Sequence, residues 1–307
     1  MRILITGGAG YIGTELTYEL CKHLSSIEEI IIYDNLSRGN YNLFIGQTKL
    51  PADKIRFVQG DLLDTRKLRK ALKGIDVVVH LAAKVTTPFA DENPHLFEQV
   101  NNWGTAELVY ALEDEPVKKF IYSSSVSVYG SSSEMVDIDS PINPKTFYGI
   151  SKLRGEEHVT RMFNKMPTYL LRFGNVYGYS KSMRFDAVIN RFMFDANFHR
   201  RISINGNGEQ HRSFIHIDKT ANLLSNIILK DGLKPGRYDV VEDNLSVNYI
   251  ADTLMDLYPG LEMLFVNQHM ALRDLKVRPN PIVNSHIDIP VRTLKEVLST
   301  FKSSFSF

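Results

Sequence analysis

The chain has 307 residues, and its 36 lysines and arginines nearly balance its 35 aspartates and glutamates, so the formal net charge at pH 7 is +1. That balance argues against a long basic surface, and we therefore expect no nucleic-acid partner. Apolar residues make up 43% of the chain and charged residues 23%, which is typical of a soluble globular protein. The length allows one large domain or two modest ones.

The cysteine content and the apolar runs indicate the compartment. Cys21 is the only cysteine, so no internal disulfide can form and a reducing compartment is the simplest interpretation. No apolar run approaches the roughly 20 residues that a membrane span needs, so we expect no membrane partner. The N-terminus MRILITGGAG lacks the longer apolar stretch of a secretory signal. We expect a cytoplasmic protein, and we predict no metal site.

Short apolar runs alternate with longer amphipathic stretches over the first 175 residues. Runs without internal alternation predict strands that are buried on both faces, as in a parallel sheet covered by helices. Strand followed by helix, repeated, predicts a Rossmann-type, doubly wound α/β fold. The runs lie at 3–5, 30–33, 55–58, 77–81, 120–122 and 169–173, and helices are expected around 16–24, 62–72, 96–112 and 146–165.

After residue 175, the regular alternation of predicted strands and helices becomes less clear. A turn is predicted at 205–208, and helices are predicted at 186–198, 219–230 and 247–257. We expect a smaller C-terminal lobe over the carboxyl edge of the sheet, where ligands bind in open α/β sheets. The predicted division gives residues 1–175, with 212–240 returning to them, to a dinucleotide-binding domain, and 176–211 with 241–307 to a substrate-binding lobe.

A glycine-rich segment follows the first predicted strand and opens the first predicted helix. Its glycines Gly7, Gly10 and Gly13 have the spacing GxxGxxG. Glycine permits a tight turn and lets backbone N–H groups approach a pyrophosphate, which the N-terminus of the following helix also attracts. Because Asp34 ends the next predicted strand, the segment matches a dinucleotide-binding site better than a plain turn.

Asp34 indicates which dinucleotide is bound. A carboxylate accepts hydrogen bonds from the ribose hydroxyls and repels a 2′-phosphate, so NAD is favoured over NADP. Arg38 lies nearby in the sequence and could moderate this preference. Asp61 and Leu62 follow the third predicted strand. Asp61 either lies beside the adenine or caps the next helix, and both interpretations stay open.

Tyr148 and Lys152 are four residues apart on a predicted helix, so they share one face. An unperturbed tyrosine has a pKa of about 10, which is too high for a base at neutral pH. We expect a nearby lysine ammonium, together with the positive charge of an oxidised nicotinamide, to lower this pKa. The serines at 123–125 end the preceding central strand, where a hydroxyl can hold the substrate oxygen. This set predicts removal of a hydroxyl proton as hydride leaves the same carbon.

The Tyr-x-x-x-Lys spacing alone does not identify the site, because it occurs three times. Tyr18 with Lys22 has this spacing, but lies in the first predicted helix. Residues 177 and 181 also have it, in a turn-like stretch. Only Tyr148 follows a serine-ended central strand, and this context selects it.

The order and spacing of several short motifs are similar to those of the extended short-chain dehydrogenase/reductases. The chain resembles in particular the NAD-dependent sugar-nucleotide epimerase/dehydratase family, which includes UDP-glucose 4-epimerases. The resemblance implies Ser125 as the catalytic hydroxyl, Tyr148 as acid and base, and Lys152 on the ribose beside the phenol. The motifs are TGGAGYIG at 6–13, YDNLS at 33–37, GDL at 60–62, HLAA at 80–83, NNWGT at 101–105, SSSVSVYG at 123–130, YGISK at 148–152, LRFGNVYG at 171–178 and RSFIHIDKTA at 212–221.

The same resemblance implies the remaining contacts. Asn175, Arg212 and Arg278 are expected on the sugar diphosphate, because arginine pairs bidentately with phosphate oxygens. His216 and Asp218 are interpreted as a link between the lobes. A homodimer is implied through helices near 95–113 and 147–165. The expected NAD contacts are Gly7, Gly10, Tyr11, Ile12, Gly13, Asp34, Asn35, Asp61, Leu62, Leu81, Ala82, Ala83, Lys84, Asn101, Tyr148 and Lys152, with Asn101 mainly supporting the helix and the cleft.

The residues after Ser125 help to distinguish between the reactions that this family catalyses. The 4,6-dehydratases of the family carry an Asp-Glu pair there, whereas this chain has Val126 and Ser127, neither a strong acid or base at neutral pH. Dehydration is therefore disfavoured, although Glu134 or Asp137 could substitute. We predict an isomerase, a UDP-glucose/UDP-galactose-type 4-epimerase working through a transient 4-keto sugar. A 4-ketoreductase and a non-catalytic NAD-binding sensor stay open as alternatives.

Overall fold

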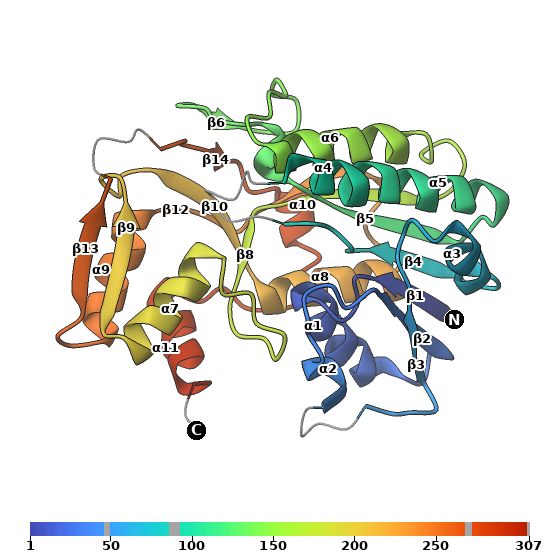
Figure 1. The fold of residues 1–307 in the computed structure, drawn as a ribbon, viewed down its shortest axis with the longest axis horizontal. Coiled ribbons are helices and arrows are strands. Elements are labelled where there is room, and N and C mark those ends of the chain that lie inside the picture. The colour runs from blue at the N-terminus through green and yellow to red at the C-terminus, as the bar shows by residue number, and fades with distance from the viewer. Residues whose placement is uncertain (46–49, 86–92, 268–271, 306–307) are drawn as a thin grey trace.

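The fold is built on a parallel sheet of seven strands with helices on both faces (Figure 1). The computed structural model describes residues 1–45, 50–85, 93–267 and 272–305. The sheet and its helices confirm the predicted Rossmann-type α/β fold. From one edge to the other, the strands are β11 (Gly236–Val240), β7 (Thr168–Phe173), β5 (Lys119–Ser125), β4 (Val77–His80), β1 (Arg2–Thr6), β2 (Glu29–Asp34) and β3 (Ile55–Gln59).

The central strands bury apolar side chains on both faces, as their unbroken runs predict. In β1, Ile3 and Ile5 join one core and Leu4 joins the other. The first core is covered by α1 (Tyr11–Leu20), which η1 (Cys21–His23) follows, and by α2 (Asn42–Ile45), α8 (Ile217–Leu229) and α10 (Pro281–Asn284). The second is covered by α3 (Thr65–Leu72), α5 (Gly104–Asp114) and α6 (Phe147–Thr160), and α5 is preceded by α4 (Pro94–Phe97) and the π-helical η2 (Glu98–Trp103).

A smaller group of elements continues from the carboxyl end of β7 and has a core of its own (Figure 1). Ile189, Ile204, Leu254 and Phe301 are buried in this core. Three small sheets belong to this part of the chain or border it. They are β12 (Asp243–Ser246), β10 (His211–His216) and β8 (Asn175–Tyr177); β13 (Glu262–Val266) with β9 (Arg201–Asn205); and β14 (Lys276–Val277) with β6 (Met135–Val136). The helices are α7 (Val188–Phe198), α9 (Val247–Leu257) and α11 (Leu294–Ser303).

Many element boundaries lie close to the predicted ones, but some helices start or end elsewhere. The helix expected over 16–24 begins at Tyr11, and the helix expected over 146–165 ends at Thr160. The helix expected over 62–72 begins at Thr65, because the Asp64 side chain accepts a hydrogen bond from the Lys67 N–H at 3.1 Å and caps it. In the expected returning segment, β11 forms an edge of the large sheet, α8 packs on α1, and β10 pairs with β8 and β12. The division into two domains stays a prediction. Within the described residues, every helix is too short or too polar to cross a bilayer.

A buried ion pair connects α6 to β7. Arg172 is fully buried, and its Nε and Nη2 donate to the two carboxylate oxygens of Glu156 at 2.9 and 2.7 Å. Arg172 also donates to the Tyr129 hydroxyl at 2.9 Å, which in turn donates to Asp239 at 2.9 Å. A buried ion pair gains little over an apolar pair, but losing one partner strands a charge away from water. The pair therefore fixes how α6 sits on the sheet.

Replacing Arg172 should cost much more stability than replacing a surface cation. We expect Arg172→Met to lower the free energy of unfolding by about 3–5 kcal/mol, because Glu156 is left buried and unpaired. Lys295→Met is the matched control: it removes an exposed pair with Asp256 and should cost less than about 1 kcal/mol. Urea denaturation of both variants measures the difference, and equal losses would contradict the assigned role of the buried pair.

Candidate functional site

A pocket opens at the carboxyl ends of β1, β2 and β4. β1 pairs with β2 on one side and with β4 on the other, and loops diverge at such a point of a doubly wound sheet. The segments that follow these strands and β3 line the pocket, together with Val100 and Arg184. Thirteen of the predicted cofactor contacts are among the lining residues: Gly7, Gly10, Tyr11, Ile12, Gly13, Asp34, Asn35, Asp61, Leu62, Leu81, Ala82, Ala83 and Lys84.

The glycine segment packs so closely against neighbouring backbone that larger side chains would not fit. Gly7 has φ +69°, and a Cβ atom there would lie 2.6 Å from the backbone of Ala82. A Cβ on Gly13 would lie 2.6 Å from the Cα atom of Gly8. Gly10 is the N-cap of α1, so the first N–H groups of that helix face this space. The segment therefore fits the close backbone approach that a dinucleotide pyrophosphate requires.

Asp34 ends β2 at the pocket, where backbone groups hold its carboxylate. The Leu36 and Ala9 N–H groups donate to its two oxygens at 2.8 and 3.1 Å. Burial raises the pKa of Asp34, and these two hydrogen bonds lower it. Such a held carboxylate suits the ribose hydroxyls of NAD.

Asp61 also lines the pocket, and it accepts a hydrogen bond from the Asn35 side chain at 2.8 Å. The alternative that Asp61 caps the next helix is wrong, because Asp64 caps α3. Asn35 and Asp61 thus form one polar edge of the pocket, between the ends of β2 and β3.

Three side chains of α6 face the serines that end β5. Tyr148, Lys152 and Glu156 follow each other at intervals of four residues, so they lie on one helix face. Tyr148 shares a hydrogen bond with Ser125, and the Lys152 ammonium donates to the Ser123 carbonyl. The Ser124 hydroxyl donates to Glu156 at 2.6 Å. The predicted trio of Ser125, Tyr148 and Lys152 is therefore brought together, although among the described residues these three do not line the pocket itself.

Glu156 is a residue that the sequence interpretation missed. Its spacing of four residues from Lys152 was a signal that could have found it. Asn101 has a supporting place: it is 1% exposed, donates to the Lys84 carbonyl and to the Ser151 hydroxyl at 2.9 Å each, and accepts from the Lys84 N–H at 2.7 Å. It thereby ties the loop after β4 to α6, and it is not among the described residues that line the pocket.

The pKa of Tyr148 does not follow the expected direction. Burial raises the pKa of its phenol, while the positive charge of Arg184 and the hydrogen bond with Ser125 act to lower it. The Lys152 ammonium instead lies 4.4 Å from the centre of the Tyr122 ring. That Lys152, together with an oxidised nicotinamide, lowers the pKa of the phenol stays a prediction. Arg184, which no sequence pattern singled out, is a further cation that acts to lower it.

Lys152 is 2% exposed, and burial lowers its pKa to about 7, against the opposing charge of Glu156. Burial disfavours the charged form of any titratable group, so it acts in opposite directions on a lysine and on a tyrosine. Near neutral pH, the Lys152 side chain is therefore poised between its charged and neutral forms.

The three residues predicted to bind the sugar diphosphate gather around Ser213. The Asn175 amide donates to the Ser213 carbonyl at 3.1 Å, and Arg212 precedes Ser213 in β10. The Ser213 hydroxyl accepts from the N–H of Val277, the residue before Arg278, at 3.0 Å. Arg212 donates to the carbonyls of His211 and Arg273, while Arg278 is exposed. Their role on a substrate stays a prediction.

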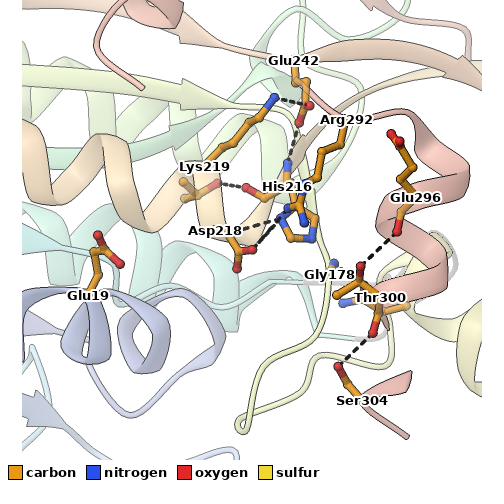
Figure 2. A network of polar contacts seen from close by, with 12 residues as sticks. Glu19, Gly178, His216, Asp218, Lys219, Glu242, Arg292, Glu296, Thr300 and Ser304 are labelled. Atoms are coloured by element: carbon orange, nitrogen blue, oxygen red, sulfur yellow. Dashed lines mark hydrogen bonds and ion pairs between the residues drawn. The ribbon is translucent and has the colours of Figure 1, made fainter. Parts of the chain in front are cut away.

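A polar network joins the start of α8 to the segment before α11. Figure 2 shows His216 among Asp218, Lys219, Glu242 and Arg292. Arg292 lies 3.5 Å from the Asp218 carboxylate, and Glu242 accepts from Lys219 at 2.6 Å and from the His216 N–H at 3.1 Å. Burial lowers the pKa of His216. Because α8 packs on α1, the network connects the last third of the chain to the glycine-bearing helix.

The other two Tyr-x-x-x-Lys pairs lie apart from β5 and meet each other. The Lys181 ammonium is 4.4 Å from the centre of the Tyr18 ring, and Lys22 pairs with Glu19 at 2.6 Å. Tyr177 packs edge-on against His216. Only Tyr148 combines the spacing with a serine at a strand end.

The buried ammonium of Lys152 should make stability depend on pH. Its folded pKa of about 7 lies below the ~10.4 of an unfolded lysine, so the unfolded chain binds more protons between these values, and stability rises with pH there. We expect Lys152→Met to raise the free energy of unfolding most below about pH 7, and less as the pH rises toward 10. Urea denaturation at several pH values measures the difference.

A second buried lysine provides the control for that experiment. Lys219 is paired with Glu242 at 2.6 Å, so Lys219→Met should destabilise the protein across the same pH range by stranding Glu242. A difference between wild type and Lys152→Met that does not change with pH would show that the ammonium is not held at a lowered pKa.

The glycine segment supports a prediction with a matched control. Gly7 and Gly39 have similar φ angles, +69° and +65°, but a Cβ atom on Gly39 would meet nothing within 4 Å. Gly7→Ala should therefore lower the NAD retained after gel filtration by at least about tenfold, since its Cβ displaces the backbone of Ala82. Gly39→Ala carries the same backbone strain and should retain NAD. Equal retention by both variants would refute the close approach at Gly7.

Comparisons with known proteins show the family to which the chain belongs. A model of the NAD dependent epimerase/dehydratase family matches residues 3–240. The putative UDP-glucose 4-epimerase of Methanocaldococcus jannaschii is 32% identical over 226 residues, 71% of this chain and 70% of that protein. The dTDP-D-glucose 4,6-dehydratase of Homo sapiens is 31% identical over 265 residues, 83% and 73% of the respective chains.

A solved structure covers nearly the whole chain. The UDP-glucuronic acid 4-epimerase from Bacillus cereus, in complex with UDP-glucuronic acid and NAD, has a TM-score of 0.84 and 25% identity, and the match covers 99% of this chain and 98% of that one. The family is NAD-dependent, so the predicted cofactor is confirmed. The glycine segment, the pocket and these similarities place the chain in the NAD dependent epimerase/dehydratase family.

Proposed function

We propose that this protein is a 4-epimerase of a nucleotide sugar, of the UDP-glucose/UDP-galactose type, acting through a transient 4-keto sugar. The observation that carries the proposal is the hydrogen bond between Tyr148 and Ser125 at the end of β5, one helical turn from Lys152. It sets a proton-transfer group next to a hydroxyl that can hold the reacting oxygen.

The residues have distinct roles in the proposed reaction. When NAD is bound, it would supply hydride chemistry at the sugar carbon, and the 4-keto sugar has to turn over in the cleft before the hydride returns to its opposite face. Tyr148 takes the proton of the 4-hydroxyl and later gives it back, and Ser125 holds the same oxygen by a hydrogen bond. Burial raises the pKa of Tyr148, and the cation of Arg184 acts in the opposite direction by favouring the phenolate. Asn175, Arg212 and Arg278 would hold the diphosphate.

The surroundings of Ser125 support epimerisation over dehydration. Elimination of water needs an acid and a base next to the catalytic hydroxyl. The two residues after Ser125 supply neither: Val126 is apolar and 4% exposed, and the Ser127 hydroxyl accepts a hydrogen bond from the Ser125 hydroxyl at 3.0 Å. Asp137, which could substitute, accepts hydrogen bonds from Ser140 within its own loop. Glu134 is exposed. Asp34 favours NAD over NADP. An epimerase keeps NAD bound through its cycle, whereas many ketoreductases consume NADPH, so this preference supports an epimerase.

The test is turnover without added cofactor. Purified protein is incubated separately with UDP-glucose, UDP-galactose, UDP-glucuronic acid, UDP-N-acetylglucosamine and dTDP-glucose, and the products are separated and weighed by mass spectrometry. Epimerisation gives a second species of unchanged mass, and dehydration gives a product lighter by one water. Absence of an epimer with every sugar would defeat the proposal, and a dehydrated product would assign the chain to the other branch of the family. The homodimer implied by the resemblance also stays a prediction, which light scattering can check.

Replacing the phenol tests the assigned acid and base. Tyr148→Phe should lower the epimerisation rate by about 10²–10⁴-fold while the bound NAD content stays the same, since only proton transfer is lost. Tyr18→Phe is the control, because Tyr18 has the same spacing to a lysine but contacts Lys181 instead of β5. An undiminished rate in Tyr148→Phe would remove this residue from the mechanism.

A further inference from the structure

One carboxylate lies between two arginines at the pocket. The Arg184 Nε donates to one oxygen of Asp186 at 3.0 Å, and Nη2 of Arg38 lies 3.5 Å from the other oxygen. Both arginines line the pocket. The side chain of Asp186 is 18% exposed and that of Arg38 is 47% exposed, so water screens the Arg38–Asp186 pair only partly. This pair joins the loop after β2 to the loop between β8 and α7, which are far apart in the sequence.

The loop that carries Asp186 is anchored independently of Arg38. The Tyr11 hydroxyl donates to the Gly178 carbonyl at 2.7 Å, and the Thr14 hydroxyl donates to that of Ser182 at 2.8 Å. The Arg184 carbonyl accepts from Asn190 at 3.0 Å. These contacts attach the loop to α1 and to α7. The position of the Asp186 carboxylate is therefore set by the fold, and Arg38, on a more exposed side chain, is drawn to it.

Arg38 is the described cation nearest in sequence to Asp34, the carboxylate at the end of β2. In dinucleotide-binding folds, a carboxylate there bonds the ribose hydroxyl of NAD, and a nearby arginine accommodates the 2′-phosphate of NADP. That phosphate carries a charge of about −1.5 to −2 near neutral pH, so a free guanidinium would attract it strongly. This chain has both a carboxylate that favours NAD, Asp34, and an arginine that could favour NADP, Arg38. Whether Arg38 is available to a 2′-phosphate depends on its ion-pair partner.

We propose that Asp186 determines the choice of dinucleotide: by engaging the guanidinium of Arg38, it withholds that cation from the 2′-phosphate of NADP and so preserves the selection of NAD. Asp34 supplies repulsion of the phosphate, and Asp186 removes the attraction that would offset this repulsion. With Asp186 in place, the group of Arg38, Asp186 and Arg184 carries a net charge of +1. Without its carboxylate, the group carries +2.

The test is a competition between the two dinucleotides. Purified Asp186→Asn and wild-type protein are equilibrated with equal excess concentrations of NAD and NADP, with no sugar present. Free nucleotide is removed, and the bound nucleotides are released by denaturation and quantified. We expect the bound NADP-to-NAD ratio to rise about three- to tenfold in Asp186→Asn, the range for a partly exposed ion pair that releases its arginine to a phosphate. The rise should be larger at low ionic strength.

Two further variants make the result specific. Asp195 on α7 also lies between two basic side chains, Arg191 at 3.4 Å and His199 at 3.1 Å, and it is 20% exposed. Asp195→Asn is therefore the matched control and should leave the ratio unchanged. Adding Arg38→Gln to Asp186→Asn should abolish the rise. Asp186→Ala makes the same charge change if the first variant folds poorly.

Two outcomes would overturn the inference: an unchanged ratio in the folded Asp186 variants, or a rise that survives the loss of Arg38. Because the readout is the nucleotide bound without any sugar, either outcome is independent of whether the protein is an epimerase.

Discussion

The contact between α6 and β5 is the constraint on which the candidate site depends. Tyr148, Lys152 and Glu156 repeat with the period of the helix and meet the serines at 123–125, which repeat along the strand. Glu156, which accepts a hydrogen bond from Ser124, also forms an ion pair with the buried guanidinium of Arg172. A shift of the helix along the strand would leave that guanidinium without its carboxylate, at a cost that no surface interaction repays. The ion pair thereby fixes the place of the phenol, about two helical turns away along α6.

Burial sets the charges of this site as much as neighbouring residues do. It raises the pKa of Tyr148 and lowers that of Lys152 to about 7, so both side chains are pushed toward their neutral forms. The structure adds positive charge near the phenol from Arg184, in the loop between β8 and α7. That loop is held by hydrogen bonds to α1, and so the proton-transfer group and the dinucleotide pocket share one support.

Much of the arrangement could be predicted from local patterns, and the failures have identifiable causes. Unbroken apolar runs predicted the strands correctly because parallel strands are buried on both faces. The helix start was placed too early because Leu62 continues the apolar spacing of α3, and a single cap, Asp64, decides where the helix begins. The effect of Arg184 on the phenol was missed because spacing shows which helix face a residue occupies but not which side chains approach that face from a distant loop.

The sequence by itself determined the strand and helix order, the glycine segment with Asp34, and the helix face that carries Tyr148 and Lys152. Each depends on residues near one another along the chain, where backbone period and glycine geometry act. Only the tertiary structure decided that Arg184 acts on the phenol, that Arg172 neutralises Glu156, and that Asp186 engages Arg38. Electrostatic and hydrogen-bond partners are chosen by distance and burial in space, and the residues concerned come from strands and loops that meet only once the sheet has formed.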